Sequence, residues 1–241
     1  MKAQYYIEEK VRKNLKYIIF VNIINMEDFY NIPFYYINLN TSVDRNNYMI
    51  EKYSNKFKHM QRVQAVDGSK ITNIKNCNSS PYELACYESH IKAIKKAYEE
   101  NRDYALIGED DLVLNEDHVQ KYYKSLISQL PEDWEILQLV CSNIKRMKLI
   151  PLNSITKFTM GNYGALLYLI NKKGMEKVIT SKTIHMDSNR ILSDYTLYKA
   201  CNTYTVSPSF QGGKYYKYET TIIYKGLIKK GKRISQILHY K

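Results

Sequence analysis

Three consecutive acidic residues, Glu109, Asp110 and Asp111, form the group whose types and spacing best suit chemistry. They follow residues 104–107, a short apolar run that is typical of a buried strand. Ligands of open α/β sheets bind beyond the carboxyl ends of the strands, so these side chains are expected at such an edge. Adjacent carboxylates repel one another, and oxygen ligands suit Mg²⁺ or Mn²⁺. The sequence predicts a divalent-metal site able to hold a diphosphate, with an acidic turn that caps the following segment as the alternative.

The elements that must position this acidic group alternate between strands and helices. Strands are predicted at 34–39, 61–66, 104–107, 135–140, 166–170 and 203–206. Helices are predicted from the turn at 40–45 through 56, and at 80–100, 117–130, 172–181 and 194–200. This alternation predicts an α/β sheet that is covered on both faces.

The helix at 80–100 has the clearest local signal. Ser80, Pro81 and Glu83 are an N-cap serine, a proline at the first helical position and a glutamate at the third. An apolar stripe predicts the buried face of this helix, and it consists of Leu84, Tyr87, Ile91, Ile94 and Tyr98. The same helix carries His90, for which a satisfied, half-buried structural role is the simplest expectation.

Composition excludes several classes of protein. The 241 residues are 44% hydrophobic and 25% charged, which argues against collagenous, wholly disordered and multi-span membrane chains. The net charge of +12 would attract nucleic acid, anionic membrane or anionic ligands, and does not choose among them. Four cysteines lack a CxxC pair, which predicts reduced, partly buried thiols rather than disulfides or a structural zinc site. The apolar run at 17–24 is too short to span a bilayer, so the protein is expected to be soluble and cytoplasmic.

Six segments, in order, resemble glycosyltransferase family 25, the lipooligosaccharide and collagen β-galactosyltransferase group. The resemblance extends from about residue 33 to residue 211, and each segment joins a strand or helix signal to polar residues. The segments are Tyr36-Ile37-Asn38-Leu39 with Asp44-Arg45, Arg62 with Ala65-Val66-Asp67-Gly68, Glu83-Leu84-Ala85-Cys86 with Ser89-His90, residues 105–111 (ALIGEDD), residues 161–170 (GNYGALLYLI) with Lys172 and Gly174, and Asp194 and Leu197 with residues 204–208.

The resemblance implies a GT-A-like nucleotide-sugar-binding fold with a mixed central sheet flanked by helices. It also implies a UDP-sugar donor, a divalent metal and inversion at the anomeric carbon, with galactose as the expected sugar. Residues 33–211 would form this domain, residues 1–32 a helical extension and residues 212–241 a basic tail. Asp111 is expected as the metal ligand, with Glu109 or Asp110 in support.

Donor-binding roles follow from the same resemblance. Asn38 and Arg45 would lie at the nucleotide end, where arginine offers a forked contact to phosphate. Asp67 would contact uridine or ribose, or would only form a turn with the glycine after it. His90 would bond a donor hydroxyl or orient the acidic loop, and Asp110 is also assigned to the donor site.

An inverting transfer needs a base that removes the proton of the acceptor hydroxyl. Asp194 is the candidate because it lies late in the chain at the start of a predicted helix, where an N-cap role is equally expected. Asp187 is the second candidate.

The acceptor would be a saccharide, glycolipid or glycoprotein. The basic tail is hypothesised to contact anionic membrane peripherally. The alternative functions are a basic nucleic-acid-binding module, which lacks a recognised motif here, and a catalytically inactive sugar-binding member of the same fold.

Overall fold

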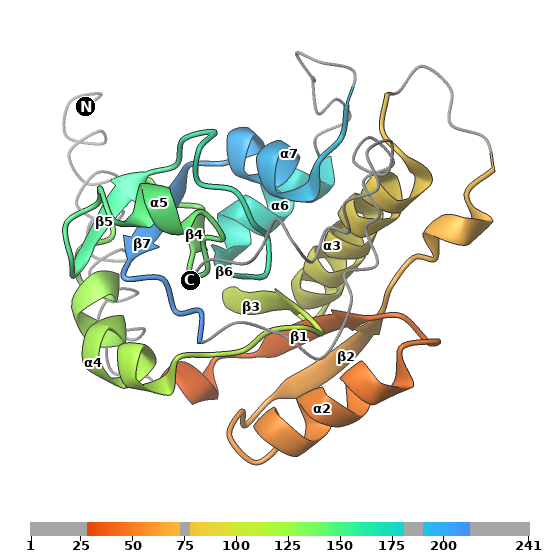
Figure 1. Cartoon of the computed structure of the whole chain (residues 1–241), viewed down its shortest axis with the longest axis horizontal. Helices are drawn as coiled ribbons and strands as arrows, with labels where there is room; N and C mark the ends of the chain where they lie inside the picture. The colour runs from red at the N-terminus through yellow and green to blue at the C-terminus, as the bar shows by residue number, and fades with distance from the viewer. Residues whose placement is uncertain (1–27, 73–77, 181–189, 213–241) are drawn as a thin grey trace, which may run out of the picture.

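The computed structural model describes residues 28–72, 78–180 and 190–212, which form a mixed seven-stranded sheet with helices on both faces (Figure 1). The strands are β1 (Phe34–Asn38), β2 (Met60–Gln64), β3 (Tyr104–Glu109), β4 (Ile136–Gln138), β5 (Ser154–Lys157), β6 (Leu167–Asn171) and β7 (Thr203–Ser207). The α-helices are α2 (Val43–Tyr53), α3 (Pro81–Glu99), α4 (Glu116–Ile127), α5 (Ile144–Met147), α6 (Lys172–Thr180) and α7 (Ser193–Ala200), and short 3₁₀ helices are η1 (Phe29–Asn31) and η2 (Gly68–Lys70). The predicted α/β class, with a mixed sheet flanked by helices, is confirmed.

The order of strands in the sheet is β2-β1-β3-β6-β4-β7-β5. β1 is parallel to β2 and β3, and β7 is parallel to β4. β6 lies antiparallel between β3 and β4, so that Gly108 pairs with Leu167. The carboxyl ends of β1, β2, β3, β4 and β7 and the start of β6 therefore share one edge of the sheet, where ligands of such folds bind.

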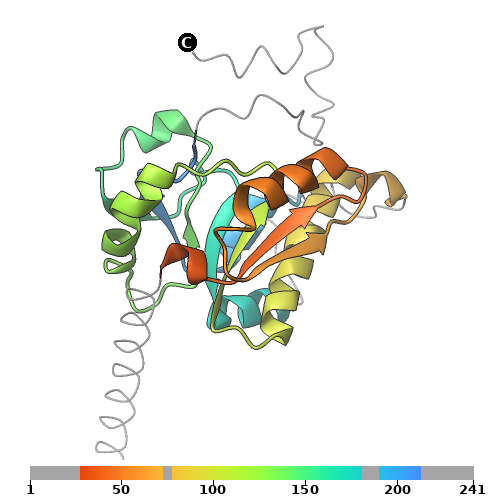
Figure 2. The same ribbon diagram turned by 90° about the horizontal axis from the view of Figure 1, so that it is seen from below.

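Alternation along the strands divides the core into two layers. Phe34 and Leu106 face a cluster with α2 and α4, whereas Tyr35 and Ile107 face a cluster with α3, α6 and α7. Figures 1 and 2 show α2 and α3 on opposite sides of the β1–β2 end of the sheet. Both faces are thus buried, as the alternation of elements predicts.

The N-terminus of α3 has the predicted capping box. The Ser80 side chain accepts a hydrogen bond from the Glu83 amide, and the Glu83 carboxylate accepts one from the Ser80 amide. The predicted apolar stripe of α3 faces the core, where Ile94 is fully buried and Tyr87, Ile91 and Tyr98 are partly buried against the same cluster. Small residues such as Ala93 and Ala97 are also fully buried on this face, and they let α3 approach the sheet.

Two short elements have no counterpart among the predictions. α5 is only four residues long, and β5 has a polar sequence and forms the edge of the sheet beside β7. Phe29 and Ile32, which fall in the predicted extension, are fully buried in the layer with α2 and α4. Residues 1–27, Asp187 and residues 213–241 lie outside the described part of the chain. Within the described part, no helix combines the length and apolarity that crossing a membrane requires.

Candidate active site

The acidic group lies in a turn at the carboxyl end of β3. The Leu112 amide donates to the Glu109 carbonyl at 3.3 Å, and the Glu109 amide donates to the Leu166 carbonyl at 3.1 Å. Gly108 precedes the turn because a Cβ there would lie 2.9 Å from the Phe34 ring. This packing fixes the backbone from which the three carboxylates project.

Asp110 is buried and is held by two side chains of the β1–α2 segment. Asn38 Nδ2 donates to its Oδ2 at 2.7 Å, and Arg45 Nη1 donates to its Oδ1 at 2.9 Å. Burial raises the pKa of Asp110, although the Arg45 guanidinium opposes this effect. The predicted donor-site residues Asn38, Arg45 and Asp110 therefore lie together, with Asn38 and Arg45 both bound to Asp110.

Asp111 is in a different electrostatic environment. Its Oδ1 is inaccessible to solvent and has no hydrogen-bond partner among the described residues. Burial and the neighbouring charge of Glu109 raise the pKa of the Asp111 carboxyl. An oxygen that is desolvated and unpaired carries a cost that a bound cation would remove.

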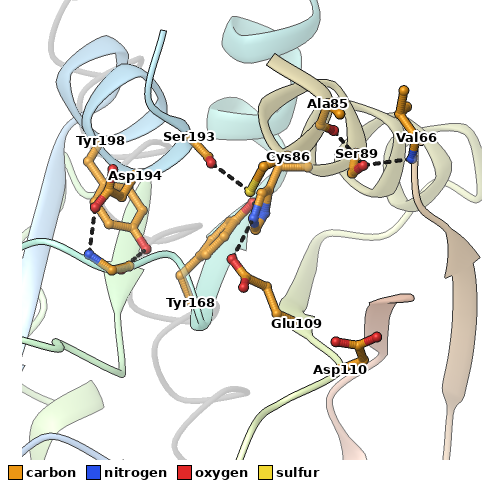
Figure 3. A network of polar contacts seen from close by, with 12 residues as sticks. Val66, Ala85, Cys86, Ser89, Glu109, Asp110, Tyr168, Ser193, Asp194 and Tyr198 are labelled. Atoms are coloured by element: carbon orange, nitrogen blue, oxygen red, sulfur yellow. Dashed lines mark hydrogen bonds and ion pairs between the residues drawn. The ribbon is translucent and has the colours of Figure 1, made fainter. Parts of the chain in front are cut away.

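Glu109 points to the other side of the turn, toward α3 and β6. Its Oε1 lies 3.2 Å from His90 Nε2, and His90 Nδ1 lies 3.2 Å from the Tyr168 hydroxyl. Figure 3 shows Glu109 directed toward Cys86 and Tyr168, whereas Asp110 points away from them. His90 is fully buried, so its observed contacts orient the acidic turn.

Asp194 lies in the first turn of α7 and is not its N-cap, which is Leu192. Its Oδ2 accepts a hydrogen bond from the Gly164 amide at 2.6 Å, and its Oδ1 accepts one from the Tyr195 amide at 2.7 Å. The Tyr198 hydroxyl donates to the Gly164 carbonyl at 3.1 Å (Figure 3). Asp194 and Tyr198 thus hold the segment before β6 against α7.

Arg62 and Asp67 lie at the β2 side of the same edge. Arg62, an exposed residue, donates to Asn38 Oδ1 at 2.7 Å and to Asn40 Oδ1 at 2.8 Å. Asp67 is the N-cap of η2 and accepts hydrogen bonds from the amide and hydroxyl of Ser69, which lower its pKa. The turn expected at Asp67 is therefore present, and its proposed contact with the nucleotide stays a prediction.

Sequence reasoning missed several residues that complete this region. Tyr168 and Ser193 contact His90 and Cys86 from elements far along the chain, and no local pattern marked them. Cys86 had a usable signal, since residues four apart on a helix share a face and Cys86 precedes His90 by four. The three cysteines of the described part, Cys86, Cys141 and Cys201, are free thiols.

A hollow of about 300 Å³ lies at the opposite ends of β1 and β3, beside Pro33, Lys58, Asn101 and Tyr104. It is remote from the acidic turn and contains none of the predicted site residues. The position of the carboxylates at the carboxyl ends of the strands, rather than this hollow, identifies the candidate active site.

Comparison with known families gives one finding. The model of glycosyltransferase family 25 (LPS biosynthesis protein) matches residues 31–194, which include β1, the acidic turn and Asp194. No curated protein matches the sequence.

Proposed function

Given that the chain belongs to glycosyltransferase family 25 and is a glycosyltransferase, we propose that it transfers a hexose from a UDP-sugar. Galactose is the first choice of sugar. The acceptor is a hydroxyl of a saccharide, glycolipid or glycoprotein, and the transfer inverts the anomeric carbon. The family match gives no support to the alternative of a nucleic-acid-binding module.

The observation that carries this proposal is the unpaired, buried Oδ1 of Asp111 at the carboxyl end of β3. Asp111 would hold Mn²⁺ or Mg²⁺, and Glu109 would support it directly or through water. The oxygen donors of these residues fit such a cation. When bound, the cation neutralises charge on a diphosphate leaving group.

The donor diphosphate has two basic residues near the ends of β1 and β2. Arg45 is 8% exposed and pairs with Asp110, so its role is to fix the acidic turn. Arg62 is exposed, which makes it the better candidate for contact with phosphate. Asn38 connects the two arginines, because it bonds Arg62 directly and also bonds Asp110, which is the partner of Arg45. Asp67 stays the candidate for contact with uridine or ribose.

Asp194 is the candidate base for the acceptor hydroxyl. A carboxylate has about four lone-pair sites, and backbone amides occupy two of them here. The remaining lone pairs can accept a proton while the two amides fix the orientation of the carboxylate. Asp194→Asn keeps the Gly164 contact through the amide oxygen and gives up the acceptor for the Tyr195 amide, so it removes the base while retaining the contact that holds the segment before β6. Transfer should fall about 10²–10⁴-fold, whereas the lost hydrogen bond should lower the free energy of unfolding by only about 1 kcal/mol.

The direct test is a screen of UDP-hexoses for UDP release and transfer, with Mn²⁺, with Mg²⁺ and with chelator. Asp111→Asn should lower metal-dependent activity at least about 100-fold, as expected when charge stabilisation in the transition state is lost. Asp117→Asn is the matched control, since Asp117 is an exposed acidic residue of α4, and its activity should equal that of the wild type. Equal, metal-independent UDP release by the wild type and Asp111→Asn would contradict the proposal. Metal-dependent UDP binding without turnover would instead indicate an inactive sugar-binding member of the fold.

A further inference from the structure

A second set of ligand atoms converges on the inner side of Glu109. Cys86 Sγ, a His90 ring nitrogen and a Glu109 carboxylate oxygen all lie within 4.8 Å of one another. Cys86 and His90 are four residues apart on α3, so they share one face of the helix. Glu109 meets them from the end of β3. A thiol, an imidazole and a carboxylate therefore face one point from two separate elements.

We propose that Cys86, His90 and Glu109 bind a transition metal of the Zn²⁺ class at a site distinct from the one at Asp111. Sulfur and imidazole ligands favour Zn²⁺ over Mg²⁺ and Mn²⁺, which prefer oxygen. Three protein ligands leave a fourth tetrahedral position for water or another ligand. On binding, the metal takes the Cys86 thiolate and the thiol proton passes to solvent.

The distances suit such a site with a small closure of side chains. Tetrahedral bonds of about 2.0–2.3 Å to zinc place neighbouring ligand atoms about 3.3–3.7 Å apart. His90 Nε2 and Glu109 Oε1 are already 3.2 Å apart. The sulfur lies within 4.8 Å of the nitrogen and the oxygen, so it has to move at most about 1.5 Å to reach this spacing.

Each of the two ligands on α3 also has a polar partner on its outer side. The Ser193 hydroxyl donates to Cys86 Sγ at 2.9 Å (Figure 3), which is the contact that a metal-bound thiolate accepts. His90 Nδ1 lies 3.2 Å from the Tyr168 hydroxyl, so Nδ1–H donates there when Nε2 binds metal. Such partners orient ligands and tune the metal.

Glu109 belongs to both proposed sites, so metal binding at the second site should affect the first. A Zn²⁺ ion held by Cys86 and His90 would keep Glu109 directed toward α3, where it already points, and away from a cation at Asp111. Zn²⁺ should therefore inhibit a reaction that uses Mn²⁺. The binding itself does not depend on the proposed transfer reaction.

The test is a titration of the reduced, full-length protein with Co²⁺, which reports sulfur ligation through a thiolate-to-cobalt charge-transfer band. One equivalent of Co²⁺ should give this band, and Zn²⁺ should abolish it by displacement, whereas excess Mg²⁺ should not. Cys86→Ser should abolish the band, and His90→Gln should weaken binding more than about 100-fold, because outer partners alone account for 10–100-fold. Ser193→Ala should weaken binding about 10-fold.

Two control variants make the result specific. Cys201→Ser removes a different buried thiol and should keep the band. Asp111→Asn should lose the proposed Mn²⁺-dependent activity and keep the band, which separates the two proposals. Absence of a charge-transfer band in the wild type overturns the proposal whether or not any variant folds. Retention of the band in Cys86→Ser overturns it as well.

Discussion

Replacing Arg45 by methionine should destabilise the fold by leaving Asp110 buried without its cation. The side chains of Arg45 and Asp110 are 10% and 9% exposed, and their 2.9 Å contact joins α2 to the acidic turn. Removing one partner of a buried pair costs about 3–5 kcal/mol. Asn38 still donates to Asp110 Oδ2 at 2.7 Å, which favours the lower half of that range.

Protonation of Asp110 sets an upper limit on the stability that Arg45→Met can lose, because a neutral carboxyl no longer needs the arginine. Neutralising a carboxyl of ordinary pKa near 3.9 at pH 7 costs about 4 kcal/mol, because each pH unit corresponds to about 1.36 kcal/mol. The free energy of unfolding of Arg45→Met at pH 7 should therefore be lower than that of the wild type by about 3–4 kcal/mol. At pH 5 the same limit falls to about 1.5 kcal/mol.

The stability deficit of Arg45→Met depends on pH because the pKa of Asp110 differs between the folded and unfolded states. Burial raises the pKa of Asp110 in the folded protein, and loss of Arg45 raises it further. The folded variant then binds more protons than the unfolded chain, so its stability rises as the pH falls. The deficit of Arg45→Met relative to the wild type should accordingly shrink between pH 7 and pH 5.

Urea unfolding in chelator-containing buffer measures this deficit at both pH values. Lys52→Met is the control, since Lys52 and Glu116 form an exposed pair at 4.0 Å that should contribute less than about 1 kcal/mol. The double variant Arg45→Met, Asp110→Asn should recover about 1–3 kcal/mol of the loss. A loss below about 1 kcal/mol in Arg45→Met, together with a raised KM for the donor, would show that Arg45 serves substrate and not Asp110.

Two further predictions concern the backbone at Gly164 and the loss of folding stability at low pH. Gly164 has φ +114°, and a Cβ there would lie 2.5 Å from Ser142 Oγ, so Gly164→Ala should lower the free energy of unfolding by about 1–3 kcal/mol. Gly161→Ala, whose Cβ would have no neighbour closer than 3.7 Å, should shift the urea midpoint much less, and equal shifts would contradict the argument. Burial opposes the charge of Glu100, yet hydrogen bonds from Tyr35, a lysine and Arg102 outweigh it and hold its pKa at about 2. Because this pKa lies below the ordinary 4.5, the contribution of Glu100 to the free energy of unfolding is present above pH 4.5 and is lost as the pH falls toward 2. Partial exposure of the side chain reduces this contribution to about 1–2 kcal/mol. Urea titrations at several pH values should therefore show that Glu100→Gln removes this part of the pH dependence.

Local signals predicted most elements of the fold. Short apolar runs identified strands such as β1 and β3, and Ser80 with Glu83 marked the start of α3 within one residue. The antiparallel insertion of β6 between β3 and β4 was not predictable in this way. Strand neighbours are chosen by packing between segments far apart in the chain, and a single sequence does not display that packing.

The candidate site was likewise predictable in part: the location of its acidic residues was, and their partners were not. The position of Glu109, Asp110 and Asp111 at the end of a strand followed from the apolar run before them. Their separate partners did not, because Arg45 is 65 residues from Asp110 and His90 is 19 residues from Glu109. Adjacent carboxylates in a turn point in different directions, and only the surrounding elements decide which becomes paired and which stays unpaired.

The order of strands also sets when the site becomes complete during protein synthesis. The amino-terminal strands are contiguous at one end of the sheet as β2-β1-β3, and the later strands follow as β6-β4-β7-β5. Both partners of Asp110 precede it in the chain, so a ribosome-bound nascent chain can pair Asp110 once β3 has emerged. Tyr168 emerges later and reaches His90 only when β6 docks on β3, and Asp194 follows when α7 packs against α3. Translation that stops before residue 167 therefore yields one half of the site without the other.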